Sequence, residues 1–341
     1  MKKRILSLAL VFLTLLFSSC NKEKEKETGD PFTPLLRFVV EEGSENQLRL
    51  FTMPESRGYF YLHPSAQGGF SGGFVSLARS ISSESVVNET VPLDFAFMRE
   101  AGEDRATLIS SAGISNLLLK ENFSETMPLP EGISLKDGIY YDELTLIGET
   151  EELLLLCPVD LSQTYVLAKK ADLPSFARPL LVTHEGERIW YALKGEEEGS
   201  YGGFAYFEKG KKEALGVEKF PFDDFVPVGN TGVIFIRHLE DGGALYLFRS
   251  LGRSVGGSFT ADEPFDAVAC DEAGKVLVGI YSGDGEGSVV ICDLATGKEK
   301  SRYVPPEASP APVIAVSRDG TEALIALSGG GEEVLGILSL S

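Results

Sequence analysis

Carboxylate side chains recur in the second half of the chain, and their types and spacing are the best suited to chemistry. Groups of them begin at residues 196, 240, 284 and 332, and the set is Glu196, Glu197, Glu198, Glu240, Asp241, Asp284, Glu286, Glu332 and Glu333. Calcium takes about six to eight oxygen ligands, more than any one group supplies. We therefore expect a surface for a cation or a basic partner. The alternative is the ordinary solvated surface of an acidic protein.

Three further aspartates each follow a proline and an apolar residue: Asp94, Asp223 and Asp266. They are 129 and 43 residues apart, the spacing of a repeat. Two carboxyl groups about 5–9 Å apart can hydrolyse a sugar linkage as acid and base. We expect a protein without catalytic activity. In the alternative interpretation, the protein is a propeller hydrolase or lyase, and Asp223 and Asp266 are its candidate acid and base.

Other catalytic and metal-binding motifs are weak. The histidines His63, His184 and His238 fall on different repeats or faces, so we expect no histidine metal site. Gly69–Gly73 and Gly252–Gly256 match the nucleophile-elbow pattern, but that motif needs a strand-to-helix turn, and no helix is expected after either one. No P-loop, dinucleotide fingerprint or zinc spacing is present, so no cofactor is predicted.

A recurring glycine predicts the elements that position these residues. Short turns centre on glycines spaced 38 to 46 residues apart, namely Gly58, Gly102, Gly148, Gly186, Gly232, Gly274 and Gly320. Each lies between two short apolar runs, as in a hairpin, where glycine adopts positive φ without steric cost. A period of about 40–45 residues is typical of the four-stranded blades of a β-propeller. The sequence therefore predicts an all-β, seven-bladed β-propeller, with six or eight blades as alternatives.

The last two repeats carry a family resemblance. Asp293–Glu299 closes the sixth copy, and Ser317-Arg318-Asp319-Gly320-Thr321 forms the turn of the seventh. Both segments resemble the repeats of WD40-like and YVTN-type propellers, although the Trp-Asp dipeptide is absent. The resemblance implies a fold and not a function.

The seventh copy ends after its third strand, so it lacks an outer strand. A spare strand, Leu36–Glu42, precedes the first copy. Because an open ring would leave an exposed edge, we expect this strand to pair with Val334–Leu340. Gln47–Met53 would then be the inner strand of the first blade.

The N-terminus is predicted to be a bacterial lipoprotein signal peptide spanning residues 1–19. Lys2, Lys3 and Arg4 precede an apolar run over 5–17, which is too short to span a bilayer, and small residues precede Cys20. This pattern resembles a lipobox, which implies lipidation of Cys20. Residues 20–34 read as a charged tether and residues 35–341 as the propeller domain.

Composition limits the partners. The formal net charge of −20 disfavours nucleic acid and anionic lipid. Cys157, Cys270 and Cys292 are left after Cys20, and the last two would lie on the first and third strands of one blade, too far apart for a disulfide. We expect three free, mostly buried thiols.

These observations predict a lipid-anchored binding or scaffold module in the cell envelope of a Gram-negative bacterium. It would be an outer-membrane lipoprotein on the periplasmic or the cell-surface side, held to the membrane by the N-terminal lipid. A protein or glycan partner would bind the face that carries the acidic hairpin tips. Phe70 and Tyr201 would lie on tips and could contact it. A glycan-binding lipoprotein of a nutrient-uptake system is a further alternative.

Overall fold

The computed structural model of the protein consists almost entirely of β-strands. It covers residues 30–39, 48–53, 58–64, 70–76, 81–87, 96–100, 105–110, 113–118, 123–135, 140–142, 145–158, 160–183, 187–211, 213–229, 232–251, 256–283 and 287–340. The predicted signal peptide, Cys20 and residues 21–29 of the predicted tether lie outside these ranges.

The described strands form seven four-stranded antiparallel sheets, the number that the glycine repeat predicts, and we call them blades 1 to 7. Blade 1 contains β2 (Arg49–Met53), β3 (Gly58–Pro64), β4 (Phe70–Ser76) and β5 (Ile81–Val87). Blade 2 contains β6 (Ala96–Glu100), β7 (Arg105–Ser110), β8 (Gly113–Leu118) and β9 (Phe123–Met127). Blade 3 contains β10 (Tyr140–Asp142), β11 (Thr145–Glu149), β12 (Leu153–Pro158) and β13 (Tyr165–Lys169).

The remaining four blades follow the same plan. Blade 4 contains β14 (Phe176–Thr183), β15 (Arg188–Lys194), β16 (Tyr201–Glu208) and β17 (Leu215–Glu218). Blade 5 contains β18 (Asp224–Val228), β19 (Gly232–His238), β20 (Ala244–Ser250) and β21 (Gly256–Ala261). Blade 6 contains β22 (Ala267–Cys270), β23 (Val276–Tyr281), β24 (Ser288–Asp293) and β25 (Lys298–Tyr303). Blade 7 contains β26 (Ser309–Val316), β27 (Glu322–Gly329), β28 (Glu332–Ser339) and β1 (Phe32–Val39).

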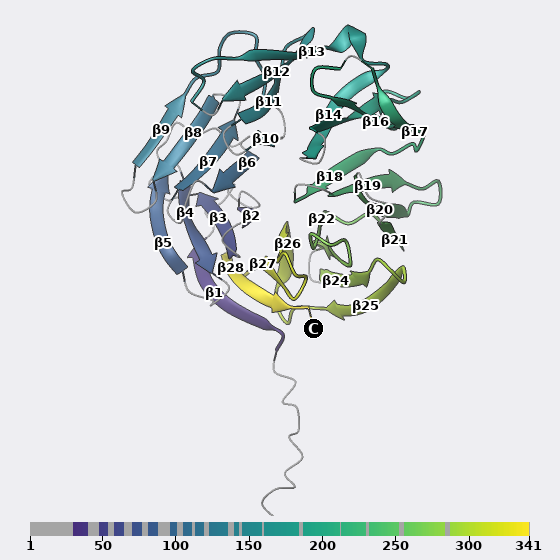
Figure 1. Cartoon of the computed structure of the whole chain (residues 1–341). Helices are drawn as coiled ribbons and strands as arrows, with labels where there is room; N and C mark the ends of the chain where they lie inside the picture. The colour runs from purple at the N-terminus through teal and green to yellow at the C-terminus, as the bar shows by residue number, and fades with distance from the viewer. Residues whose placement is uncertain are drawn as a thin grey trace, which may run out of the picture.

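The blades are arranged in a ring, with the first strand of each blade on the inside (Figure 1). Contacts between first strands follow the circle, from β18 to β22, β22 to β26, β26 to β2 and β2 to β6. The chain is an all-β propeller. Helix is as scarce as expected, since the described residues contain one 3-10 helix, η1 (Lys170–Asp172). Among these residues, no helix is long and apolar enough to cross a membrane.

The N-terminal strand closes the ring, as the sequence predicts. β1 pairs antiparallel with β28, and the register runs from Phe32 opposite Leu338 to Val39 opposite Glu332. The backbone N–H of Ser339 extends this pairing by donating to the Pro31 carbonyl at 3.0 Å. The strand begins at Phe32, earlier in the chain than the predicted Leu36. Closure supplies the last blade with an outer strand and covers the edge of β28.

Gly102 and Gly186 of the glycine repeat lie outside the described residues, and Gly58 and Gly232 each begin a second strand. Gly274 and Gly320 do occupy turns between first and second strands, with φ of 66° and 70°. Gly148 instead lies within β11, opposite Leu155. A Cβ at this position would be 2.6 Å from Cys157 Sγ, so close side-chain packing requires the glycine. The prediction for Gly148 is therefore wrong, and the hairpin tip of blade 3 is the segment 150–152 between β11 and β12.

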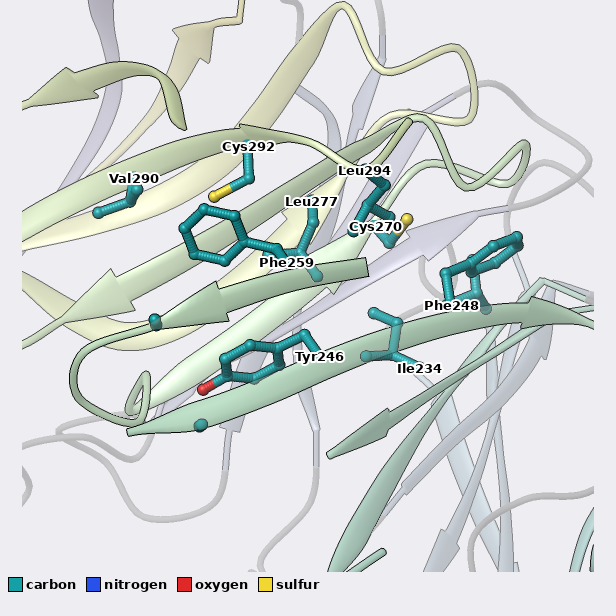
Figure 2. Close-up of a cluster of buried hydrophobic side chains, with 12 residues drawn as sticks. Ile234, Tyr246, Phe248, Phe259, Cys270, Leu277, Val290, Cys292 and Leu294 are labelled. Atoms are coloured by element: carbon teal, nitrogen blue, oxygen red, sulfur yellow. The ribbon is translucent and has the colours of Figure 1, made fainter. Parts of the chain in front are cut away.

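The hydrophobic core lies between neighbouring blades. The cluster between blades 5 and 6 includes Tyr246 and Phe259 from one blade and Leu277 and Cys292 from the other. Figure 2 shows these side chains directed toward one another across the two sheets. Similar clusters join blades 3 and 4, 4 and 5, 6 and 7, and 7 and 1. In the described part of the chain, blade 1 and blades 3 to 7 are thus each stabilised by burial against a neighbouring blade, as propeller blades require.

Candidate functional site

The face of the ring that carries the hairpin tips between second and third strands is the candidate site. Two of the connections from an outer strand to the next inner strand lie on the same face, as two contacts demonstrate. The backbones of Tyr201 and Phe222 form an antiparallel bridge between blade 4 and the entry to blade 5. The Ser309 hydroxyl donates to the Gly283 carbonyl at 2.7 Å, which joins the tip of blade 6 to the entry of blade 7. We call this the tip face.

Most of the described acidic tip residues are exposed on this face. Glu196, Glu197 and Glu198 form the tip of blade 4, and Glu240 and Asp241 form the tip of blade 5. The carboxylate of Asp241 accepts a hydrogen bond from the Gly243 N–H within its own turn, at 3.1 Å. The other four carboxylates form no hydrogen bond or ion pair with any described residue. They are therefore available to a partner from solution.

The sequence interpretation missed two members of this group. Glu151 and Glu152 are exposed on the tip of blade 3, between β11 and β12. The glycine repeat predicts a turn at Gly148, and such a turn would put this segment on the opposite face of the ring. The pattern itself carries a signal, because Thr150-Glu151-Glu152 is the polar interruption between two apolar strands. We define the acidic tip arc as Glu151, Glu152, Glu196, Glu197, Glu198, Glu240 and Asp241, on three consecutive blades.

The two glutamates predicted for the tip of blade 7 do not join the arc. The tip itself is formed by Gly330 and Gly331, with φ of 63° and 82°, and both glutamates belong to β28. Glu332 is exposed but forms an ion pair with Arg37 of β1, at 3.2 Å. Glu333 is only 2% exposed. Because side chains alternate along a strand, one glutamate points outward and the next points into the seam.

Asp223 and Asp266 have a structural task within their own blades. Asp223 Oδ2 accepts a hydrogen bond from the N–H of His238, at 2.7 Å. Asp266 Oδ2 accepts from both the N–H and the hydroxyl of Ser282, each at 2.7 Å. Each carboxylate therefore ties the entry of an inner strand to the end of the second strand beside it. Asp94, Asp284 and Glu286 lie outside the described residues.

Of the two aromatic candidates for ligand contact, the structure describes the side chain of Tyr201 alone, and that ring is packed against other rings. The Tyr201 ring stacks on Phe222 at 4.8 Å between centroids and also contacts Phe225. It begins β16 and belongs to the seam between blades 4 and 5 rather than to a free tip. The side chain of Phe70 lies outside the described residues. The backbone of Ser71 is within β4, which fits the rejection of a nucleophile elbow there.

The three thiols behave as the sequence predicts. Cys157, Cys270 and Cys292 are all free and buried. Leu277 pairs with both Cys270 and Cys292, so these two cysteines flank it on the first and third strands of blade 6 (Figure 2). Burial raises the pKa of Cys157 to about 11 and that of Cys292 to about 12. Burial, reinforced by Asp271, also raises the pKa of Cys270. Such thiols are packing groups and poor nucleophiles.

The opposite face of the ring holds polar groups that build the turns. Asp271 is 1% exposed, and its Oδ1 accepts from the N–H groups of Lys275 and Val276 at 2.7 and 2.6 Å. Ser317 does the same in blade 7, since its hydroxyl accepts from Thr321 and Glu322. These groups satisfy backbone donors in the turns between first and second strands of blades 6 and 7.

An ion pair between Glu272 and Arg318 joins two such turns in neighbouring blades. The backbone N–H of Glu272 also donates to the Arg318 carbonyl, at 3.3 Å. Within the described part of the chain, no group of three or more His, Cys, Asp or Glu side chains is arranged to hold a metal ion.

Comparisons with known proteins identify the fold. No family model matches the sequence, and no curated protein matches it. Solved structures do match. A chain of the mitotic checkpoint complex aligns with a TM-score of 0.55 and 8% identity, over 94% of this chain and 96% of the other. A chain of the hydrazine synthase of Kuenenia stuttgartiensis aligns with a TM-score of 0.52 and 12% identity, over 92% and 97%.

A third match shows that the same architecture occurs within a larger protein. A prolyl endopeptidase aligns with a TM-score of 0.52 and 13% identity, over 82% of this chain and 45% of the other. At such low identities, similarity concerns the architecture alone, because one fold supports many functions. The strands, their pairing and these neighbours together establish the chain as a β-propeller.

Proposed function

We propose that this protein is a lipid-anchored binding module of a Gram-negative cell envelope, and that its acidic tip arc binds a basic protein. The signal-like N-terminus and Cys20 support the anchor, and the charged segment after Cys20 is suited to a tether. A propeller held in this way presents a broad, rigid face to a partner. The protein would be attached to the outer membrane, on its periplasmic or cell-surface side.

The observation that carries the proposal is the position of the acidic tip arc. It supplies seven exposed carboxylates from three consecutive blades, and only that of Asp241 is bonded within the described residues. A concentration of one charge attracts an oppositely charged partner and accelerates its association. Ion pairs at an exposed rim contribute modestly to affinity, so binding should weaken as ionic strength rises.

The protein partner is favoured over the two alternatives. A glycan site would use exposed aromatic rings, whereas Tyr201 is packed against Phe222. A hydrolase would use Asp223 and Asp266, and each of these carboxylates already holds the backbone of its own blade. A basic protein requires only the charge distribution that the exposed tips provide.

Crosslinking and pulldown from intact cells tests the binding role. The variant E196Q/E197Q/E198Q should fold normally and capture a basic partner roughly several-fold less well, with a further loss when E151Q/E152Q is added. The matched control D160N/E187Q/E213Q removes three carboxylates from connections on the opposite face of blades 3 and 4. If both tip variants capture the same partners as well as the wild type and the control do, the acidic tip arc is not the binding surface.

Cell fractionation tests the anchor separately. Wild-type protein should fractionate with membranes, and Cys20→Ser should move it to the soluble fraction. A Cys157→Ser variant serves as the control, because that thiol is buried within the propeller. Membrane association that survives Cys20→Ser would contradict lipidation.

A further inference from the structure

The outer edge of blade 3 is apolar and uncovered. β13 lies on the outer rim of the ring, and among the described strands it pairs with β12 alone (Figure 1). Tyr165 and Val166 at its start are 52% and 61% exposed. The other exposed large apolar residues in the described part of the chain are Val217 on β17 and Val304 after β25. β13 therefore combines a free backbone edge with two adjacent exposed apolar side chains.

The other outer strands with described side chains carry features that oppose pairing with a second chain. β25 exposes four charged side chains, and β17 is only four residues long and contains a glycine with positive φ. In β21, the Ser258 N–H donates to the Leu294 carbonyl of blade 6 at 3.1 Å. β1 contains Pro34 and the exposed Arg37. Charges, proline and short length protect free edges, and β13 has no proline and no charge before Lys169.

The sequence of β13 fits an antiparallel copy of itself. Its pairing with β12 shifts once, which leaves Leu167 without a register partner at the middle of the strand. Tyr165 lies two residues before this point, and the exposed Lys169 lies two residues after it. A two-fold axis at Leu167 would place Tyr165 of one copy beside Lys169 of the other, and symmetry makes the contact twice. A cation is attracted to the face of an aromatic ring, so the two contacts are favourable.

Charge also favours this edge for contact with a second copy. The chain has a formal net charge of −20, so two copies repel each other over most of their surfaces. β13 contains no carboxylate, and Lys170 directly after it forms a 3.1 Å ion pair with Glu149 of the same blade. A second acidic chain therefore meets little repulsion along this strand. Because the strand has only five residues, the contact is smaller than a standard stable interface, and we expect weak association.

We propose that two copies of this chain associate through β13, paired antiparallel about Leu167, so that their third blades form one continuous sheet. Salt screens the repulsion between two acidic copies, so this association should strengthen as ionic strength rises. Binding of a basic partner at the acidic tip arc should weaken under the same change. Dimerisation through β13 does not depend on that arc, and the two responses to salt distinguish failure of one from failure of the other.

Disulfide crosslinking in intact cells treated with a mild oxidant tests the pairing. Full-length Tyr165→Cys and Lys169→Cys chains with different tags should form a mixed disulfide when they are produced together. Residues directly opposite each other in antiparallel strands have Cα atoms about 4.5–5.5 Å apart, which a disulfide can span. Each variant alone should crosslink several-fold less. The pair Val217→Cys and Val304→Cys is the matched control, because these residues are equally exposed but lie off β13.

Sedimentation velocity of the detergent-solubilised full chain is the second measurement. Val166→Lys adds a charge to the edge and should lower the dimer fraction several-fold, whereas Val304→Lys should leave it unchanged. The wild-type dimer fraction should rise with salt. Absence of the mixed disulfide, an equal yield in the control pair, or a dimer fraction that falls with salt would each overturn the pairing. If the cysteine variants do not fold, equal sedimentation of the wild type and both lysine variants overturns it instead.

Discussion

The carboxylate of Asp223 accepts a 2.7 Å hydrogen bond from the backbone N–H of His238, fifteen residues later in the chain. Asp266 makes the equivalent bond to Ser282 in the next blade. The repeated Pro-Phe-Asp segment is therefore a structural signature: the proline begins the entry, the phenylalanine packs, and the aspartate ties the first strand to the second. The two aspartates that the sequence offers as a candidate acid and base instead hold the backbone of their own blades.

Asp223→Ala should lower the free energy of unfolding by about 1 kcal/mol, because a charged acceptor is removed from a backbone donor. Chemical denaturation with an unchanged m-value would measure this loss. Asp262→Ala, an exposed aspartate with no hydrogen bond or ion pair to a described residue, is the control and should be nearly neutral. Equal stability of the two variants would show that the bond contributes nothing.

Removing the closing strand should cause association. A chain that begins after residue 42 exposes the full edge of β28, which is otherwise paired from Glu332 to Leu338. Unpaired edges recruit other strands, so we expect aggregates or higher oligomers in size-exclusion chromatography with light scattering. A chain that begins at residue 30 retains β1 and should stay monodisperse. A monodisperse, fully stable protein lacking β1 would contradict the closure.

Gly148→Ala should destabilise blade 3 by about 1–3 kcal/mol, because the new methyl group would overlap Cys157 Sγ. The double variant Gly148→Ala with Cys157→Ala should recover part of this loss, since the smaller side chain leaves room. Gly283→Ala is the control, because nothing lies within 4 Å of a Cβ there. A Gly148→Ala variant as stable as wild type would show that the packing is loose.

Thiol labelling at pH 8 should be slow in the native protein and complete in denaturant. Burial raises the pKa of Cys157 to about 11 and of Cys292 to about 12, so almost no thiolate forms at pH 8. The experiment uses a chain in which Cys20 is replaced, so that only the thiols of Cys157, Cys270 and Cys292 can react with the label. Fast labelling of all three in the native state would contradict their burial.

Alkaline pH should destabilise the fold by deprotonating the buried thiols of Cys157 and Cys292. A pKa raised in the folded state means that the folded protein holds its proton longer than the unfolded chain. The associated stability is complete below the ordinary thiol pKa of about 8.5 and is lost as pH rises toward the folded values. Burial also raises the pKa of Tyr246 to about 12, which extends the loss to higher pH. Melting temperatures measured from pH 8 to 11 should fall steadily, and a constant value would contradict this.

The architecture could be predicted from local signals. Alternating apolar runs, turn residues and a repeat of about forty residues specify short antiparallel strands, and the spare strand before the first repeat predicted the closure between β1 and β28. Boundaries were less certain: β1 begins at Phe32 and not Leu36, because pairing with β28 continues as far as that strand offers donors and acceptors. The predicted turn at Gly148 was wrong because close packing against Cys157 and a tight turn both favour glycine, so the residue type does not distinguish them.

The sequence by itself determined that the chain forms repeated hairpins, that its thiols are apolar and unpaired, and that the hairpin tips of blades 4 and 5 are acidic. These features depend on residue type and short-range spacing. Only the tertiary structure decided which carboxylates face solvent, because that depends on strand register: Glu332 and Glu333 are neighbours in the chain, yet one is exposed and the other meets His63 in the closing seam. A shift of one residue along a strand moves a side chain to the opposite face, and only long-range pairing sets that register.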